Sequence, residues 1–243
     1  MIKTQIKNLL LVFFIVFCNC TIIGQENTDV QARFYAAADY KITKKWQVAF
    51  EYRYAMDHDI SEFRNNSFEI GTKYDVAKKM SLETGYRFTT SYEKDSHLLF
   101  LSYQYKYKFN KRFTLGSTTR YQFRTLGFDA DLMQYYKEPS QFIREKLRLE
   151  YNVPKSKASL YFAPEIFLKI DNSLEFNRMR YTLGGDYLLK YGNTLGLSLF
   201  YENKYNPQKT DRFVLSTKYN LSIDELIKKI NKNKEKKEKK EKI

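Results

Sequence analysis

Charged side chains recur at every second position along several aromatic-rich stretches of this chain. Glu51 and Arg53 form one such set, and Arg144, Lys146 and Arg148 form another. A spacing of two places side chains on one face of a β-strand. Carboxylates and guanidinium groups on a shared face can pair, and an excess of cations attracts anions. The candidate residues for this chemistry are Glu51, Arg53, Glu83, Arg87, Arg120, Arg144, Lys146, Arg148, Glu150, Glu165, Arg180 and Glu202.

The chain contains two histidines that could act as catalytic bases. His58 lies between Asp57 and Asp59, and His97 follows Ser96. A hydrolytic site needs a base beside a nucleophile, oriented by a third group, and adjacency in sequence does not create that geometry. No G-x-S-x-G, H-E-x-x-H or glycine-rich phosphate loop is present. We therefore predict no catalytic residue, no cofactor and no metal site. A loop metal site at Asp57, His58 and Asp59 is the alternative.

The residues between the charged positions are large and apolar. Val48, Phe50 and Tyr52, for example, lie on the opposite strand face from Glu51 and Arg53. Eleven segments repeat this pattern, and most are longer than the ~5–6 residues of a typical globular strand. They match the ~9–11 residues that a tilted transmembrane strand needs. Their spans are 30–42, 46–55, 66–77, 80–91, 97–109, 112–124, 142–153, 157–170, 178–191, 194–205 and 212–221.

Short and long connections alternate between these segments. The short turns are 43–45, 78–79, 110–111, 154–156 and 192–193, and the longer loops are 56–65, 92–96, 125–141, 171–177 and 206–211. Short periplasmic turns and longer external loops are typical of outer-membrane barrels. The pattern predicts an all-β fold, an antiparallel transmembrane β-barrel of 10–12 strands, in the outer membrane of a Gram-negative bacterium.

The strand count and the orientation of the faces each leave an alternative. Bacterial single-chain barrels have an even number of strands, so segment 30–42 lies outside the wall, giving ten, or one further strand exists, giving twelve. A soluble lipocalin-like barrel would turn the apolar face inward to hold a ligand. Aromatic residues near the segment ends, such as Trp46 and Phe213, flank aliphatic ones such as Leu115 and Leu199. This banding favours lipid contact.

The two ends of the chain differ from the barrel region, 25–221. Residues 1–24 resemble a signal peptide, with basic residues before an apolar run too short to span a bilayer. Both cysteines, Cys18 and Cys20, lie in this leader, and acylation of one of them is the alternative. Residues 222–243 form a basic tail that begins with helical apolar spacing and ends in a Lys/Glu run typical of solvated chain.

The formal net charge of +14 raises the question of nucleic-acid binding. The basic residues alternate with apolar ones along strands, no recognition motif is present, and the leader directs export. We therefore predict no nucleic-acid partner. The expected partners are outer-membrane lipid, lipopolysaccharide and the outer-membrane assembly machinery, and the oligomeric state is left open.

Several short motifs resemble domain-of-unknown-function family 2490. They are Lys44-Lys45-Trp46, Glu51-Tyr52-Arg53-Tyr54, Gly85-Tyr86-Arg87, Arg144-Glu145-Lys146-Leu147-Arg148 and Pro164-Glu165. The resemblance covers about residues 30–221 and implies a predicted outer-membrane barrel of a kind common in Bacteroidetes. It carries no activity and no catalytic residues.

The expected function follows from the charged face. If that face lines the lumen, its residues form a ladder of ion pairs that fixes the barrel's shape, or a narrow polar solute pore with a net-basic lumen. The row Arg144, Lys146 and Arg148 is the best candidate for an anion contact, and its alternative is pairing with neighbouring glutamates. We predict that the protein is not an enzyme. The competing prediction is an outer-membrane enzyme acting on lipid or envelope substrates.

Overall fold

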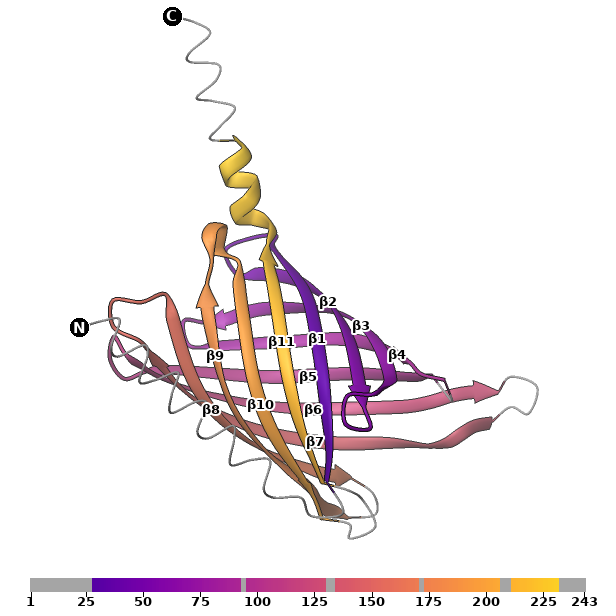
Figure 1. Ribbon diagram of the computed structural model, residues 1–243. Coiled ribbons are helices and arrows are strands. Elements are labelled where there is room, and N and C mark those ends of the chain that lie inside the picture. The colour runs from indigo at the N-terminus through magenta and orange to yellow at the C-terminus, as the bar shows by residue number, and fades with distance from the viewer. Residues whose placement is uncertain (1–27, 93–94, 130–133, 171–172, 206–210, 232–243) are drawn as a thin grey trace, which may run out of the picture.

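The computed structural model describes residues 28–92, 95–129, 134–170, 173–205 and 211–231. These residues form one closed barrel of eleven strands (Figure 1). The strands are β1 (Thr28–Lys41), β2 (Trp46–Asp57), β3 (Glu62–Ala77), β4 (Met80–Thr90), β5 (Ser96–Lys108), β6 (Phe113–Asp129), β7 (Gln134–Asn152), β8 (Ala158–Ile170), β9 (Leu174–Leu188), β10 (Thr194–Lys204) and β11 (Asp211–Ser222). The short 3-10 turn η1 (Lys190–Gly192) joins β9 to β10. The predicted leader 1–24 lies outside the described residues.

The barrel closes between its first and last strands in parallel. Consecutive strands pair antiparallel from β1 to β11, and β1 pairs β11 parallel from Thr28↔Asp211 to Asp39↔Ser222. The eleven predicted segments are confirmed as the strands. Both even-numbered alternatives, ten and twelve, are wrong, because segment 30–42 is in the wall and an odd count is accommodated by this parallel seam. β1 therefore starts at the long-loop rim, whereas β11 ends at the short-turn rim (Figure 1).

Three predicted loops are shorter in the structure than the sequence pattern indicates. The loop predicted at 171–177 is one of them, because β9 starts at Leu174. The loop predicted at 125–141 is largely strand, because β6 extends to Asp129 and β7 starts at Gln134. The loop predicted at 56–65 narrows in the same way, because β3 starts at Glu62. The extensions at 62–65 and 134–141 lack the apolar alternation of the rest of the wall. A strand segment beyond the apolar band does not need alternating apolar residues, so the sequence does not indicate it as a strand.

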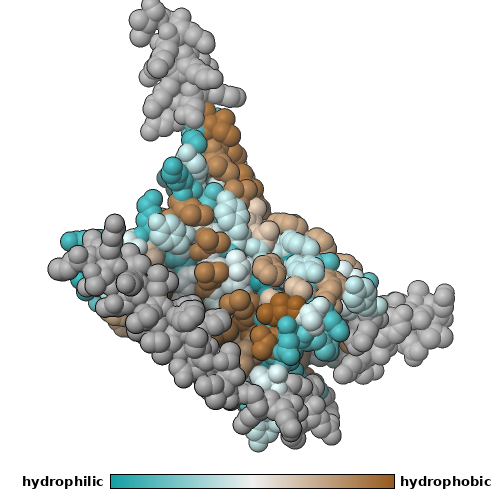
Figure 2. All heavy atoms as spheres, viewed as in Figure 1, coloured by the Kyte–Doolittle hydropathy of each residue, from teal (hydrophilic) through white to brown (hydrophobic). Residues whose placement is uncertain are grey.

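Apolar side chains cover the outside of the barrel. Ile70 is 61% exposed, Leu183 is 58% exposed and Leu101 is 54% exposed. Apolar residues lie along the strands that face the viewer in Figure 2. The most deeply buried side chains instead face the lumen and include Phe167 and the charged Glu202. The barrel is thus apolar on its outer surface and charged within, the reverse of a soluble globule.

A nine-residue helix at 223–231 follows β11 directly at the short-turn rim (Figure 1). Ser222 leads into it, with its backbone N–H donating to Asn193 Oδ1 at 3.1 Å. The apolar spacing of this segment predicts the helix, and Ile227 and Ile230 are exposed on it. No helix among the described residues is long and apolar enough to cross a bilayer.

Glycines on the inner face make room for aromatic rings that fill the lumen. A Cβ on Gly85 of β4 would lie 2.7 Å from Phe100 Cζ and 2.6 Å from the Ile70 carbonyl oxygen. On Gly116 of β6, by contrast, the nearest atoms would lie 3.9 Å away. The barrel is therefore tightly packed beside β4 and β5 and looser beside β6 and β7.

This difference predicts unequal effects of the same substitution at two inward positions. Gly85→Ala should lower the free energy of unfolding by about 1–3 kcal/mol, because the added methyl overpacks against Phe100. Gly116→Ala, the matched control, should stay within about 0.5 kcal/mol of the parent protein. Urea unfolding of the refolded barrel, followed by the fluorescence of the single tryptophan, Trp46, measures both. Equal losses in the two variants would contradict the packing described.

Candidate functional site in the barrel lumen

The structure places all twelve predicted site residues on the inner face of the barrel. Several of their contacts join strands that are not neighbours in the sheet, which only the concave side allows. Lys218 Nζ on β11 lies 2.6 Å from Glu51 Oε2 on β2, across β1. Arg148 Nη2 on β7 lies 2.7 Å from Asp186 Oδ2 on β9, across β8. The charges therefore converge in the lumen, as the period-two spacing predicts.

Glu202 is the most deeply buried charge of this network. It is fully inaccessible to solvent. Arg180 Nη2 donates to its Oε2 at 2.6 Å, and Arg212 Nη2 donates to its Oε1 at 2.5 Å. Arg178 Nε approaches the same Oε1 at 3.7 Å. One carboxylate on β10 thus holds three guanidinium groups from the two strands that flank it, β9 and β11.

Glu165 is a second centre beside the first. Arg144 Nη2 donates to it at 2.5 Å and Arg180 Nη1 at 3.2 Å, so Arg180 links Glu165 to Glu202. The ring of Phe167 lies against the Arg144 guanidinium at 4.5 Å from the ring centroid. Cation–π contacts and pairing together allow arginines to pack in a space that excludes bulk water.

Three ion pairs lie between two cavities of the lumen. Arg53 Nη2 lies 3.3 Å from Glu51 Oε1, Arg120 Nη2 lies 3.3 Å from Glu83 Oε2, and Arg87 pairs with Glu69. The three arginines line a cavity of about 790 Å³ that opens toward the long-loop rim. The three glutamates line a cavity of about 240 Å³ on the other side. We call these the outer and inner cavities, and the three pairs the partition.

The outer cavity is strongly cationic. Among the described residues that line it are ten arginines and one lysine, against the carboxylates of Asp57 and Glu62. The basic residues are Arg33, Arg53, Arg64, Arg87, Arg120, Arg124, Arg144, Arg178, Arg180, Lys204 and Arg212. The inner cavity instead combines the three partition glutamates with Lys73 and Lys218. The partition is therefore polarised: its arginines line the outer cavity and its glutamates line the inner cavity.

Several of these residues were not among the sequence candidates. Arg33 and Arg212 face the lumen from β1 and β11 and follow the period-two register, so a full reading of those strands finds them. Arg64 differs, because it lies at a β-bulge where Ala55 pairs with Asn65 and Met56 with Phe63. A bulge shifts the alternation by one residue. No sequence periodicity assigns Arg64 to a face.

The basic row on β7 does not present free cations to a ligand. Arg144 pairs with Glu165, Arg148 pairs with Glu150 at 3.2 Å and with Asp186, and Lys146 lies opposite Glu165 in the register. The pairing alternative is therefore the one that the structure contains. Of the three, only Arg144 lines the outer cavity.

The two histidines lie apart from each other. His97 is on the outer face, where its Nδ1 lies 2.6 Å from Tyr86 Oη, while the neighbouring Ser96 lines the outer cavity. His58 lies in the β2–β3 turn, with its Nδ1 3.2 Å from Asp57 Oδ1 and 3.5 Å from Glu62 Oε2. The described residues contain no cluster of three or more potential metal ligands.

These features define a class of protein: a closed β-barrel with an apolar outer surface and a charged, partitioned lumen. The profile of a family described as "Protein of unknown function (DUF2490)" matches residues 30–214, and the chain belongs to that family. The predicted resemblance is thus confirmed. No curated protein matches the chain.

Two solved structures show a distant likeness. One, titled "Bacterial polysaccharide outer membrane secretin", is 11% identical over 74% of this chain, with a TM-score of 0.46. This chain spans 63% of that protein's length. The other, titled "Unveiling the Mechanism Behind the in-meso Crystallization of Membrane Proteins", is 11% identical over 76% of this chain and 79% of its own, with a TM-score of 0.40.

The environment of Glu202 predicts a large loss of stability when its charge is removed. Glu202→Gln leaves Arg178, Arg180 and Arg212 without their shared carboxylate, and should cost about 3–5 kcal/mol of unfolding free energy. Glu62→Gln is the control, because Glu62 is exposed and its removal should cost below about 1 kcal/mol. The urea midpoint of heat-modifiable gel mobility measures both. A Glu202→Gln barrel as stable as the control would contradict the role of Glu202.

The contacts of His58 predict a titration that depends on Asp57. The hydrogen bond to Asp57 and the charge of Glu62 raise the pKa of His58 above its ordinary value. The folded state therefore favours the protonated imidazole, and this stabilisation is lost as the pH rises through the folded-state pKa. In Asp57→Asn the His58 pKa should fall toward its ordinary value. NMR titration in a His97→Gln background measures it, and an unchanged pKa would contradict the assignment.

Proposed function

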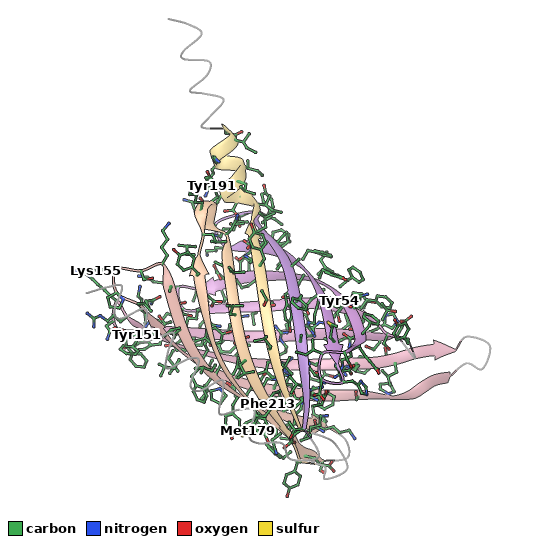
Figure 3. The ribbon with its side chains drawn as sticks, in the orientation of Figure 1. Tyr54, Tyr151, Lys155, Met179, Tyr191 and Phe213 are labelled. Carbon is green, nitrogen blue, oxygen red and sulfur yellow. The ribbon has the colours of Figure 1, made fainter. Side chains whose placement is uncertain are left out.

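We propose that this protein is a β-barrel of the outer membrane of a Gram-negative bacterium. The exposed apolar surface supports lipid contact, because charged residues facing hydrocarbon would cost about 2–4 kcal/mol each near the bilayer centre. Aromatic residues near both rims also support it: Tyr151 and Tyr191 lie toward the short turns, and Tyr54 and Phe213 toward the long loops (Figure 3). In this orientation the outer cavity faces the cell exterior and the helix at 223–231 faces the periplasm.

The partners follow from the same orientation. Lipopolysaccharide and outer-membrane lipid contact the apolar surface, and the outer-membrane assembly machinery inserts the barrel. The signal peptide expected at residues 1–24 would direct export and is consistent with this route.

The activity that the lumen supports best is a narrow, porin-like passage for small anionic solutes, without catalysis. The polarised partition carries this proposal. Its arginines line the outer cavity and its glutamates the inner one, so anions entering from outside meet a cationic surface first. Rings of fixed charge select permeant ions by sign. The ion pairs between the cavities restrict the width of the passage and keep its conductance low.

Conductance of the purified, folded barrel in planar bilayers tests this proposal. We expect small single-channel steps and a reversal potential that favours chloride over potassium in a salt gradient. The double variant Glu69→Gln/Arg87→Gln removes one partition pair and should raise the conductance. The matched control is Glu225→Gln/Lys228→Gln, which removes a 2.6 Å ion pair outside the lumen and should leave the conductance unchanged.

Two outcomes would overturn the proposal. A folded barrel without conductance steps would exclude a passage. Unchanged conductance in the Glu69→Gln/Arg87→Gln barrel would exclude the partition as its narrowest part. Heat-modifiable mobility of each variant shows first that the barrel has folded. Release of fatty acid from lipid by the purified protein would instead support the competing class, an envelope enzyme.

A further inference from the structure

We propose that the outer cavity is a binding site for a small multivalent oxyanion, a solute that carries two or more phosphate or carboxylate groups. This inference rests on the proposed function in one respect, the opening of the cavity to the cell exterior. It goes further by assigning a ligand class and naming the residues that bind it.

The outer cavity carries an excess of positive charge. Eleven basic residues line the outer cavity. The carboxylates available to them are Asp57 and Glu62 in its lining and Glu51, Glu69, Glu83, Glu165 and Glu202 at its walls. Eleven cations against seven carboxylates leave an excess of four positive charges in the described part of the site. Such an excess within a low-dielectric wall attracts anions strongly.

Three arginines of the outer cavity have a hydrogen-bond donor without a partner. Within the described residues, the Nε atoms of Arg53, Arg178 and Arg212 are buried and have no hydrogen-bond partner. A buried donor without a partner costs free energy, and more so when it is charged. All three arginines line the outer cavity. The internal carboxylates therefore leave these three guanidinium groups incompletely hydrogen-bonded.

Two arginines of the outer cavity lack a carboxylate counter-ion among the described residues. Among the described residues, no carboxylate oxygen lies within 4.0 Å of Arg33 or Arg124. Arg33 lies against the ring of Phe200, 5.1 Å from its centroid. The charged groups that act on Arg124 are two more arginines, Arg53 and Arg64. Tyr35 is a hydrogen-bonding neighbour of Arg33, but no described carboxylate neutralises either guanidinium group, so both charges can be neutralised by a ligand.

The arrangement of these arginines explains why the ligand is multivalent. Arg33, Arg53 and Arg212 come from the adjacent strands β1, β2 and β11, whereas Arg124 comes from β6 and Arg178 from β9. A single oxyanion group satisfies one or two guanidinium forks. Donors on separate walls therefore favour a ligand with several anionic groups. A volume of about 790 Å³ lies within the ~300–1,000 Å³ typical of small-molecule sites.

The partition explains why such an anion is held rather than passed freely. Below the arginines lie the glutamates of the inner cavity, Glu51, Glu69 and Glu83. A multivalent anion that moves past the partition loses its guanidinium contacts and meets these carboxylates. The outer cavity is therefore the free-energy minimum for the anion along the lumen.

Isothermal titration of the folded, full-length barrel in a non-ionic detergent tests the inference. Inorganic pyrophosphate and citrate are the probes, and they distinguish phosphate from carboxylate recognition. We expect one site per barrel for at least one probe. Arg33→Gln and Arg124→Gln should each weaken binding by about tenfold, because each removes a charge-assisted contact. Arg112→Gln, in an exposed short turn, is the matched control and should bind like the parent.

The outcomes separate this inference from the proposed passage. Loss of binding in Arg33→Gln and Arg124→Gln but not in Arg112→Gln supports the site. Absence of binding of both probes by a folded barrel would overturn it, as would equal binding by all three variants and the parent. Binding without conductance would leave the site standing and remove the passage. Conductance without binding would support the passage and overturn the binding site. Heat-modifiable mobility confirms that each variant is folded.

Discussion

The structure depends on pairing arginines with carboxylates inside a closed barrel. Eleven strands enclose a lumen too narrow to hydrate every charge fully, and the outer surface is apolar. Unpaired guanidinium groups would repel one another across this space, and moving them outward would place them on the apolar outer surface. Glu202, Glu165 and the partition glutamates resolve the conflict by each holding one or more arginines. The fold and the lumen chemistry thus have one physical basis.

That pairing is incomplete and uneven along the barrel. Carboxylates are concentrated in the middle and the inner half, while the two arginines without a carboxylate partner among the described residues, Arg33 and Arg124, line the outer cavity. The middle is thereby stabilised as a partition and the outer half is left electropositive. In the proposed membrane orientation this asymmetry gives the lumen a direction, since the outer cavity is strongly cationic whereas the inner cavity combines three carboxylates with two lysines. The parallel β1–β11 seam adds a second asymmetry, because it places the start of β1 and the end of β11 at opposite rims.

Much of this architecture could be predicted from residue periodicity. The alternation of Phe50 with Glu51 and Arg53 places each side chain on its correct face, because a strand has only two faces. Strand number was ambiguous for a different reason: the pairing of β1 with β11 is a contact between residues nearly 200 positions apart, and no local pattern encodes it. The partition could not be predicted from the sequence either. Which glutamate reaches which arginine depends on strand tilt and register, so the sequence indicated pairing of the β7 row without identifying Glu165 and Asp186 as the partners of Arg144 and Arg148.

The central claim is that the apolar face of each strand contacts lipid while the charged face lines the lumen. Two positions on β3 test it directly, in a chain with Cys18 and Cys20 replaced by serine: Ile70→Cys on the outer face and Lys73→Cys in the inner cavity. Each carries a fluorescent label in a reconstituted bilayer that contains brominated lipid. We expect strong quenching of the label at position 70 and little quenching of the label at position 73. Quenching of the label at 73, with the label at 70 protected, would contradict it.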